Sequence, residues 1–259
     1  MIILKRTSNI AESKKVTVPL SFELVNVLSW HKTDTIYYEL CPYSLKTDGL
    51  EENGVLSDVI FENYWQSSKI FEYVYDVEVY PHYSFKNKPE YLWWKYSCPK
   101  GKELHFDKNT NTITSEYYNW RNSLWQCPHP IRYPNGRNRT KLTLFSLGYV
   151  LNGNVYEERR YNYIEARKDI YMKEYIRLIR KLPIYQELLI KVKNGQNILI
   201  TEVDLPELNK KGYYGKFVDS DNIYRPTLGT LNLLLNDSSE PFGHGLCLAY
   251  ALLEDISKN

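Results

Sequence analysis

Apolar and polar positions alternate most regularly in the C-terminal half of the chain. In the segment 161–182, the apolar residues recur at helical spacing and form one stripe, which consists of Ile164, Tyr171, Tyr175, Leu178 and Leu182. Pro183 breaks or restarts this helix, because proline cannot donate a backbone hydrogen bond. The helical pattern then continues to Gly195, a residue typical of helix ends. We therefore expect helix on both sides of Pro183.

Three more elements are predicted after Gly195. Residues 196–204 form a short, β-branched apolar run, which is typical of a buried strand, and this strand would end at Asp204. Residues 228–237 predict a helix. After a turn, residues 241–256 predict a last helix, whose packed positions would be Leu246, Ala249, Tyr250 and Leu253.

The N-terminal half gives weaker signals. Residues 15–30 indicate a strand and a short apolar segment, and residues 35–46 have strand-like content before a turn at 47–49. Asp58 is placed to cap a helix of about residues 59–74, in which apolar residues again recur at helical spacing.

Residues 75–130 differ in character from the rest of the chain. The stretch 75–85 alternates like a strand, turn residues follow, and a helix is expected at 115–125. The sequence therefore predicts an α+β fold. We expect a single, mainly helical domain with a small β component, an irregular aromatic-rich insertion at 75–130 and a helical C-terminal half at 160–259.

Composition narrows the classes of protein. Of 259 residues, 43% are hydrophobic and 25% charged, which is typical of a globular chain. The net charge of +2 does not demand a nucleic-acid partner. No apolar run suits a signal peptide or a membrane helix, so we expect no membrane partner and a soluble protein in the cytoplasm. Abundant Lys, Asn, Tyr and Ile favour an AT-rich genome, such as that of a virus.

The cysteines and histidines give no metal pattern. The cysteines have no Cys-x-x-Cys spacing and the five histidines are scattered. The four cysteines are Cys41, Cys98, Cys127 and Cys247. We therefore expect reduced thiols and no metal or redox cofactor.

The segment 58–72, "DVIFENYWQSSKIFE", carries the densest group of candidate functional residues. On a helix, Glu62, Gln66 and Lys69 share one face. A solvated polar face is the ordinary explanation. However, Tyr64 and Trp65 lie in the same turn, and a carboxylate beside large rings can serve as an acid or a base.

This segment resembles the NADAR family of N-glycosidases over about residues 37–72. The family has an E-H-Y-F-Q-A-x-K motif, and "ENYWQSSK" at 62–69 is similar to it in order and spacing. Asn63 stands where the family usually has His. The upstream "LCPY" at 40–43 keeps only Tyr43 of the family's first motif.

The resemblance implies an α-helical N-glycosidase whose substrates are phosphorylated riboflavin intermediates or ADP-ribose adducts, including adducts on DNA. It implies Glu62 as the catalytic carboxylate. It also implies Trp65 and Gln66 as pocket residues and Lys69 as a structural or phosphate partner; Tyr64 would help to shape the pocket. A carboxylate suits this chemistry, because cleavage of an N-glycosidic bond develops positive charge at the anomeric carbon.

Two candidates lie near the C-terminus. His244 sits between Gly243 and Gly245 at the start of a predicted helix, where free N–H groups could bind an anion. A simple glycine-rich helix start explains the motif equally well. Asp204 would lie at the carboxyl end of a strand, where ligands often bind, although an acid in a loop is the commoner explanation.

Arginines supply the candidate phosphate contacts. Arg132 and Arg139 belong to a basic run at 132–141, which could grip phosphates or could be a solvated loop. Arg167 falls on the apolar stripe of its helix and should be paired, either with a carboxylate of the chain or with a ligand phosphate.

The sequence leaves three classes of function open. The first is an N-glycosidase-like hydrolase that cleaves a base from a nucleotide-like small molecule or from ADP-ribosylated nucleic acid. The second is a non-catalytic module that binds ADP-ribose or nucleic acid. The third is a viral accessory protein that docks on a protein partner through the aromatic insertion.

Overall fold

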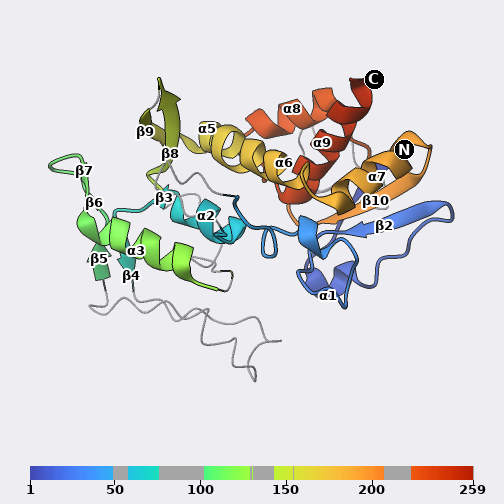
Figure 1. The fold of residues 1–259 in the computed structure, drawn as a ribbon, viewed down its shortest axis with the longest axis horizontal. Coiled ribbons are helices and arrows are strands. Elements are labelled where there is room, and N and C mark those ends of the chain that lie inside the picture. The colour runs from blue at the N-terminus through green and yellow to red at the C-terminus, as the bar shows by residue number, and fades with distance from the viewer. Residues whose placement is uncertain are drawn as a thin grey trace. The chain divides into compact units, whose positions relative to one another are not determined.

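The chain divides into two compact units in the structure, a computed structural model (Figure 1). Unit 1 comprises residues 1–45 and 167–259, and unit 2 comprises residues 46–166, which are inserted into it. The insertion expected at 75–130 falls within unit 2, and its role as an insertion stays a prediction. The structure describes residues 1–48, 58–75, 102–128, 130, 143–153, 155–206 and 223–258.

Unit 1 contains a four-stranded sheet of order β11-β1-β10-β2. Its strands are β1 (Ile2–Arg6), β2 (Phe22–Asn26), β10 (Asn197–Glu202) and β11 (Ile223–Tyr224). Strand β10 pairs in parallel with both β1 and β2, and β11 is antiparallel to β1. Ile198, Leu199 and Ile200 are fully buried, as a continuous apolar run in a central parallel strand should be. The predicted strand is confirmed, but it ends at Glu202 and not at Asp204.

Unit 1 also contains the helices that the C-terminal pattern predicted, together with two short N-terminal turns that it did not predict. They are α1 (Ile10–Ser13), the short turn η1 (Tyr38–Leu40), the π-helical turn η5 (Arg167–Met172), α6 (Lys173–Ile179), α7 (Pro183–Lys193), α8 (Leu228–Asn236) and α9 (His244–Ser257). Pro183 begins α7, and Gly195 follows its end with a φ of 90°, both as expected.

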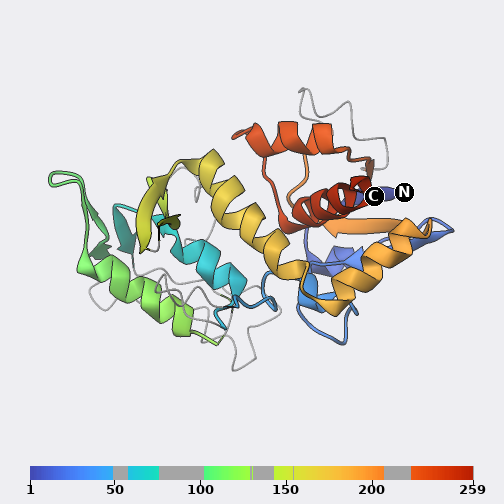
Figure 2. The ribbon, with the colours of Figure 1, turned by 45° about the horizontal axis from the view of Figure 1, so that its top comes forward.

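Helix α9 is the centre of the unit 1 core. It packs on β10 and β1 and contacts α6, α7 and α8 (Figure 2). Of the four residues expected to pack in the core, Leu246 and Ala249 are buried, whereas Tyr250 and Leu253 are only half-buried. The buried set extends around the helix and consists of Gly245, Leu246, Cys247, Leu248, Ala249, Ala251 and Leu252. A helix with neighbours on several sides buries more than one stripe.

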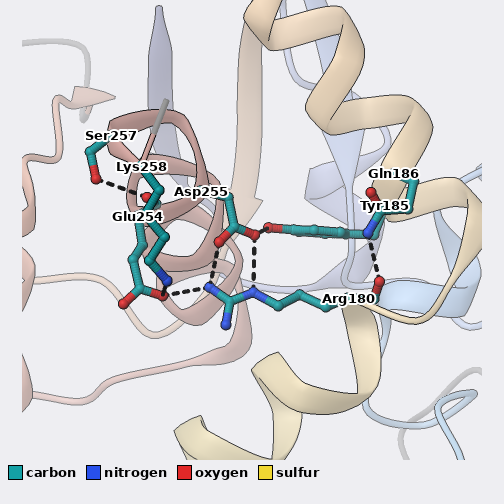
Figure 3. Close-up of polar contacts among 7 residues, drawn as sticks. All are labelled: Arg180, Tyr185, Gln186, Glu254, Asp255, Ser257 and Lys258. Carbon is teal, nitrogen blue, oxygen red and sulfur yellow. Dashed lines mark hydrogen bonds and ion pairs between the residues drawn. The ribbon is translucent and has the colours of Figure 1, made fainter.

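Ion pairs fasten the end of α9 to the corner between α6 and α7 (Figure 3). The Arg180 guanidinium makes a bidentate contact with Asp255, at 2.9 Å from Nε and 2.7 Å from Nη2. Its Nη2 also donates to Glu254 Oε2 at 2.5 Å. The Tyr185 hydroxyl donates to Asp255 Oδ2 at 2.7 Å, so both oxygens of this carboxylate are bonded.

Unit 2 is built from short strands and two longer helices. Its elements are α2 (Phe61–Ser67), β3 (Lys69–Ile70), β4 (Tyr73–Tyr75), β5 (Lys102–Leu104), β6 (Phe106–Asp107), β7 (Thr112–Ile113), α3 (Ser115–Gln126), β8 (Phe145–Asn152), β9 (Val155–Tyr161) and α5 (Tyr163–Ala166). Strands β3, β8 and β9 form one sheet, and β4–β5 and β6–β7 form two hairpin-like pairs. The core includes Phe71, Val74, Tyr117, Trp120 and Leu124. Helix α3 confirms the helix expected at 115–125.

Helix α2 is much shorter than the predicted helix 59–74. It starts after Ile60, and Asp58 does not cap it but adopts a φ of 69°. The hydroxyls of Ser67 and Ser68 donate back to the carbonyls of Tyr64 and Trp65. Such back-bonding competes with helix continuation. In addition, the Ser68 carbonyl accepts the backbone N–H of Leu147, so the chain leaves the helix there.

The strand expected at 35–46 is absent; the described chain forms the turn η1 and irregular backbone there. Contacts with distant residues hold this turn. The Tyr37 hydroxyl donates to Glu23, and the Leu40 carbonyl accepts the Tyr175 hydroxyl at 2.7 Å. Of the strand expected at 75–85, only Tyr75 is described, as the last residue of β4; residues 76–85 and Gly49 of the expected turn lie outside the described residues. The α+β class is confirmed, with a β component larger than expected.

Candidate functional site

A chain of three polar side chains crosses the surface of α2. Lys69 Nζ donates to Gln66 Oε1 at 2.9 Å, and Gln66 Nε2 donates to Glu62 Oε1 at 2.7 Å. Glu62 is 7% exposed and Gln66 is 3% exposed. The expected common face of these residues therefore exists, although Lys69 lies in β3, just after the helix. It is a mostly buried polar chain and not a solvated face.

The two oxygens of the Glu62 carboxylate differ. Oε1 accepts from Gln66, whereas Oε2 accepts no hydrogen bond from any residue that the structure describes. Lys69 Nζ also lies 4.5 Å from the centre of the half-buried Trp65 ring, a cation–π contact. A carboxylate that is held through one oxygen, and whose other oxygen accepts no hydrogen bond from the described residues, can stabilise positive charge or activate a water molecule.

Contacts with α3 fix the orientation of α2. Asn63 Nδ2 donates to the carbonyl of Leu124 at 3.1 Å, near the end of α3. Trp125 Nε1 donates to Ser67 Oγ at 2.8 Å. Because Asn63 and Ser67 are one turn apart, they turn one side of α2 toward α3, and Glu62 lies on the adjoining side. Asn63, at the position where the NADAR motif usually has His, is thus a helix-to-helix connector here.

Tyr64 is a buried part of this segment. Its side chain is 8% exposed, and its ring centre lies 6.2 Å from that of Phe61. This position suits a residue that shapes the surroundings of Glu62 through packing.

A second buried carboxylate, Glu202, lies in unit 1 and was not singled out in the sequence. It ends β10 and is fully buried. Its Oε2 accepts the backbone N–H of Gly245 at 2.5 Å, at the start of α9. Its Oε1 accepts the N–H groups of Val203 and Asp204 at 2.8 and 3.0 Å. At the start of α9, a carboxylate of the protein itself therefore accepts a backbone N–H of the kind that could bind an anion.

The two glycines of the motif at 243–245 leave room for that carboxylate. A Cβ atom at Gly243 would lie 2.7 Å from the Glu202 carboxylate, and one at Gly245 would lie 2.8 Å from its Oε2. Neither distance is compatible with ordinary packing. The "GHG" sequence and Glu202 thus form one structural unit. The sequence did contain a signal for Glu202, because it is an acidic residue at the end of an apolar run. The sequence analysis named Asp204, two residues later, as the candidate instead.

His244 contacts the same carboxylate and a neighbouring strand end. Its Nε2 lies 2.9 Å from the Val27 carbonyl, which can only accept, so this nitrogen carries a proton. Its Nδ1 lies 3.7 Å from Glu202 Oε2. Burial, with the charge of Glu202 adding to it, raises the pKa of the nearby Cys247 thiol well above its usual value. These contacts fit the structural explanation of the motif; a ligand role of His244 stays a prediction.

The Arg167 guanidinium is 2% exposed, and backbone carbonyls surround it. Its Nη1 donates to Leu234 and Asp237 at 3.1 and 2.9 Å, and its Nη2 donates to Glu240 at 2.7 Å. Because the last carbonyls of a helix lack partners within it, Arg167 satisfies the end of α8. This pairing favours the structural explanation of Arg167 over a ligand phosphate.

The other expected site residues are spread over the chain. Asp204 is exposed in unit 1 and donates its backbone N–H to Glu202. Arg132 and Arg139 lie outside the described residues. Glu62, Tyr64, Trp65, Gln66 and Lys69 all belong to unit 2, so the structure brings these five together. Arg167 and His244 belong to unit 1.

The described residues show neither a metal-binding cluster nor a membrane-spanning helix. No group of three His, Cys, Asp or Glu side chains in that part of the chain is arranged to hold a metal ion. Within the same residues, no helix has the length and apolar character that crossing a membrane requires.

Comparison with known proteins gave no match, neither to a family model, nor to a curated protein, nor to a solved structure. The relation of residues 62–69 to the NADAR family therefore stays a prediction from the sequence.

Proposed function

We propose that the protein is an N-glycosidase-like hydrolase in which Glu62 is the catalytic carboxylate. The observation that carries this proposal is the burial and the hydrogen bonding of the Glu62 side chain. It is almost buried, Gln66 holds one of its oxygens, and the other oxygen receives no hydrogen bond from the described residues. The similarity of 62–69 to the NADAR motif adds support, because the family's Glu, Gln and Lys fall on the three residues of this hydrogen-bonded chain.

The proposed reaction adds water across the bond between the anomeric carbon and a base. As the C–N bond breaks, the bonding pair leaves with the base and positive charge develops on the sugar ring. The Glu62 carboxylate stabilises this charge or takes a proton from the attacking water, and the base leaves with a proton. Trp65 would supply a ring face beside the sugar or the base.

The substrate that we propose is a phosphorylated glycoside of the nucleotide or ADP-ribose type, either free or attached to nucleic acid. It follows from the motif resemblance and from the cation at Lys69, which lies at the same site. Such substrates occur in the cytoplasm, where we propose that the protein acts. An origin in a virus remains an expectation from composition.

The test is a turnover assay with a small panel of compounds. Wild-type protein and Glu62→Gln would be incubated with ADP-ribosylated guanosine, ADP-ribosylated DNA, NAD and phosphorylated riboflavin precursors. Released base would be measured by liquid chromatography and mass spectrometry. Glu72→Gln is a matched control, because Glu72 lies in the same unit and its carboxylate is already paired with Lys108.

We expect the wild type and Glu72→Gln to release a base from one member of the panel, and Glu62→Gln to release at least 100-fold less. Equal release by Glu62→Gln would contradict the role of Glu62. If nothing is cleaved but ADP-ribose raises the melting temperature of both proteins, the non-catalytic binding module is the better description. If neither effect is found, a docking role gains support.

A further inference from the structure

The orientation of the Gln66 amide follows from chemistry. The oxygen and nitrogen of an amide side chain look alike in shape, so their assignment depends on the neighbours. The neighbour on one side is the Lys69 ammonium group, which can only donate hydrogen bonds. The amide atom that faces it at 2.9 Å must therefore be Oε1. The Nε2 group is then left to face Glu62 at 2.7 Å.

We propose that Lys69 is a positioning residue: it locks the Gln66 amide so that the amide NH₂ group holds Glu62 Oε1 and leaves Oε2 as the reacting atom. The inference rests on the proposed function of Glu62 and adds to it the identity of the reacting oxygen and the residue that sets it. An amide turned the other way would place its NH₂ group against an ammonium and its oxygen against a carboxylate, and both contacts would be repulsive.

Lys69 is itself held in place. Its Nζ lies 4.5 Å from the Trp65 ring centre, and the residue is in β3, which pairs with β8. The ammonium therefore has a ring on one side and the Gln66 oxygen on another. Side chains that orient a metal ligand from the outer shell typically change activity 10- to 100-fold when they are removed, and we expect an effect of the same size for Lys69.

This role differs from a phosphate contact, which the motif resemblance also allows for Lys69. A residue that only grips phosphate acts mainly on substrate binding, so its loss raises KM. A residue that orients the catalytic carboxylate acts on the chemical step, so its loss lowers kcat.

The first test does not depend on activity. The side-chain amide signals of Gln66 would be recorded by ¹H–¹⁵N nuclear magnetic resonance (NMR) in wild type, Lys69→Met and Lys69→Arg, with assignment from Gln66→Met. Lys46→Met is the control, because Lys46 is a partly exposed lysine of the same unit that bonds the Asp58 carbonyl. We expect two well-separated NH₂ signals in wild type, Lys69→Arg and Lys46→Met, and their convergence in Lys69→Met. Unchanged signals in Lys69→Met would overturn the proposal.

The second test uses whichever compound of the panel the wild type cleaves. We expect Lys69→Met to lower kcat 10- to 100-fold with KM changed less than threefold, and Lys69→Arg to restore most of the rate. A raised KM with unchanged kcat would overturn the positioning role in favour of a phosphate contact. If no compound is cleaved, the proposed function fails, and the Gln66 signals alone decide whether Lys69 orients the amide.

Discussion

Glu62 and Glu202 are both buried carboxylates, but they differ in how their oxygens are used. The Glu202 carboxylate is fully buried and accepts three backbone N–H groups, shared between its two oxygens. Glu62 is 7% exposed and accepts one side-chain N–H on one oxygen. Burial alone therefore does not distinguish a structural carboxylate from the catalytic one that we propose at Glu62. A carboxylate with every oxygen bonded holds the fold, and one with an open oxygen can react.

The comparison also shows what happens to a helix start that could bind an anion. The start of α9 has the free N–H groups and glycines that suggested a ligand site. The buried Glu202 side chain at the end of β10 supplies the negative charge there, and the partial positive charge of the helix end stabilises it. A side chain of the protein thus occupies a helix start of the kind that can bind an anion, and a ligand role for His244 stays a prediction.

The largest effect should follow from removal of the Glu202 carboxylate. In Glu202→Ala, three backbone N–H groups lose their acceptor inside the protein, and we expect a loss of about 3 to 5 kcal/mol in the free energy of unfolding. Urea unfolding followed by circular dichroism would measure it. A loss below about 1 kcal/mol would mean that Glu202 is not the anchor of the α9 start.

A smaller loss should follow from filling the space that Glu202 occupies. In Gly245→Ala the new Cβ would lie 2.8 Å from Glu202 Oε2, and we expect a loss of about 1 to 3 kcal/mol from overpacking. Gly229→Ala is the control, because its Cβ would meet only Thr227 Oγ1 at 3.7 Å. Equal stability of the two variants in urea would show that the glycines of the motif serve another purpose.

Glu254 and Asp255, the partners of Arg180, are a third kind of carboxylate: they are hydrogen-bonded but partly exposed to solvent. We expect Arg180→Met to lose about 1 to 2 kcal/mol at pH 7, since partly exposed ion pairs contribute little each. The hydrogen bond from Arg180 lowers the pKa of Glu254 below its ordinary value of 4.5. A lowered pKa in the folded state adds stability above pH 4.5, and this stability is lost as the pH falls through the folded-state pKa.

The difference in unfolding free energy between wild type and Arg180→Met should therefore shrink below about pH 4.5. Thermal unfolding from pH 3 to pH 7 would follow it. A difference that stays constant over this range would show that Arg180 stabilises the corner through packing and not through the Glu254 charge.

The smallest effect on stability is expected for Glu62→Gln. The amide oxygen can still accept from Gln66, and no other described group loses a partner. We expect a change within about 1 kcal/mol in urea unfolding. A loss as large as that of Glu202→Ala would mean that Glu62 is a structural carboxylate and would remove the contrast between the two residues.

Local signals in the sequence predicted the helices well. Pro183 and Gly195 marked the bounds of α7, and the apolar run before Glu202 marked the central strand. These elements follow from proline and glycine backbone chemistry and from hydrophobic periodicity, which act over a few residues.

The features that the sequence did not predict, the end of α2 and the turn η1, depend on contacts with residues far away in the sequence. Helix α2 ends at Ser67 partly because Leu147 takes the Ser68 carbonyl, and the Ser67 carbonyl accepts the Tyr117 hydroxyl at 2.8 Å. The turn η1 depends on Glu23 and Tyr175. For the site, spacing predicted that Glu62, Gln66 and Lys69 share a face, but neither the burial of Glu62 nor the occupant of the α9 start can be read from spacing.

The most direct test of the contrast between the two carboxylates is an NMR titration with ADP-ribose. The protein would be labelled with ¹³C at the glutamate carboxyl carbons and with ¹⁵N. The Glu62 carboxyl signal would be assigned from its loss in Glu62→Gln, and the Gly245 amide signal from standard backbone experiments. We predict that ADP-ribose shifts the Glu62 carboxyl and Gln66 amide signals and leaves the Gly245 amide unchanged. A shift at Gly245 with Glu62 unchanged would place the ligand at the α9 start and contradict the account.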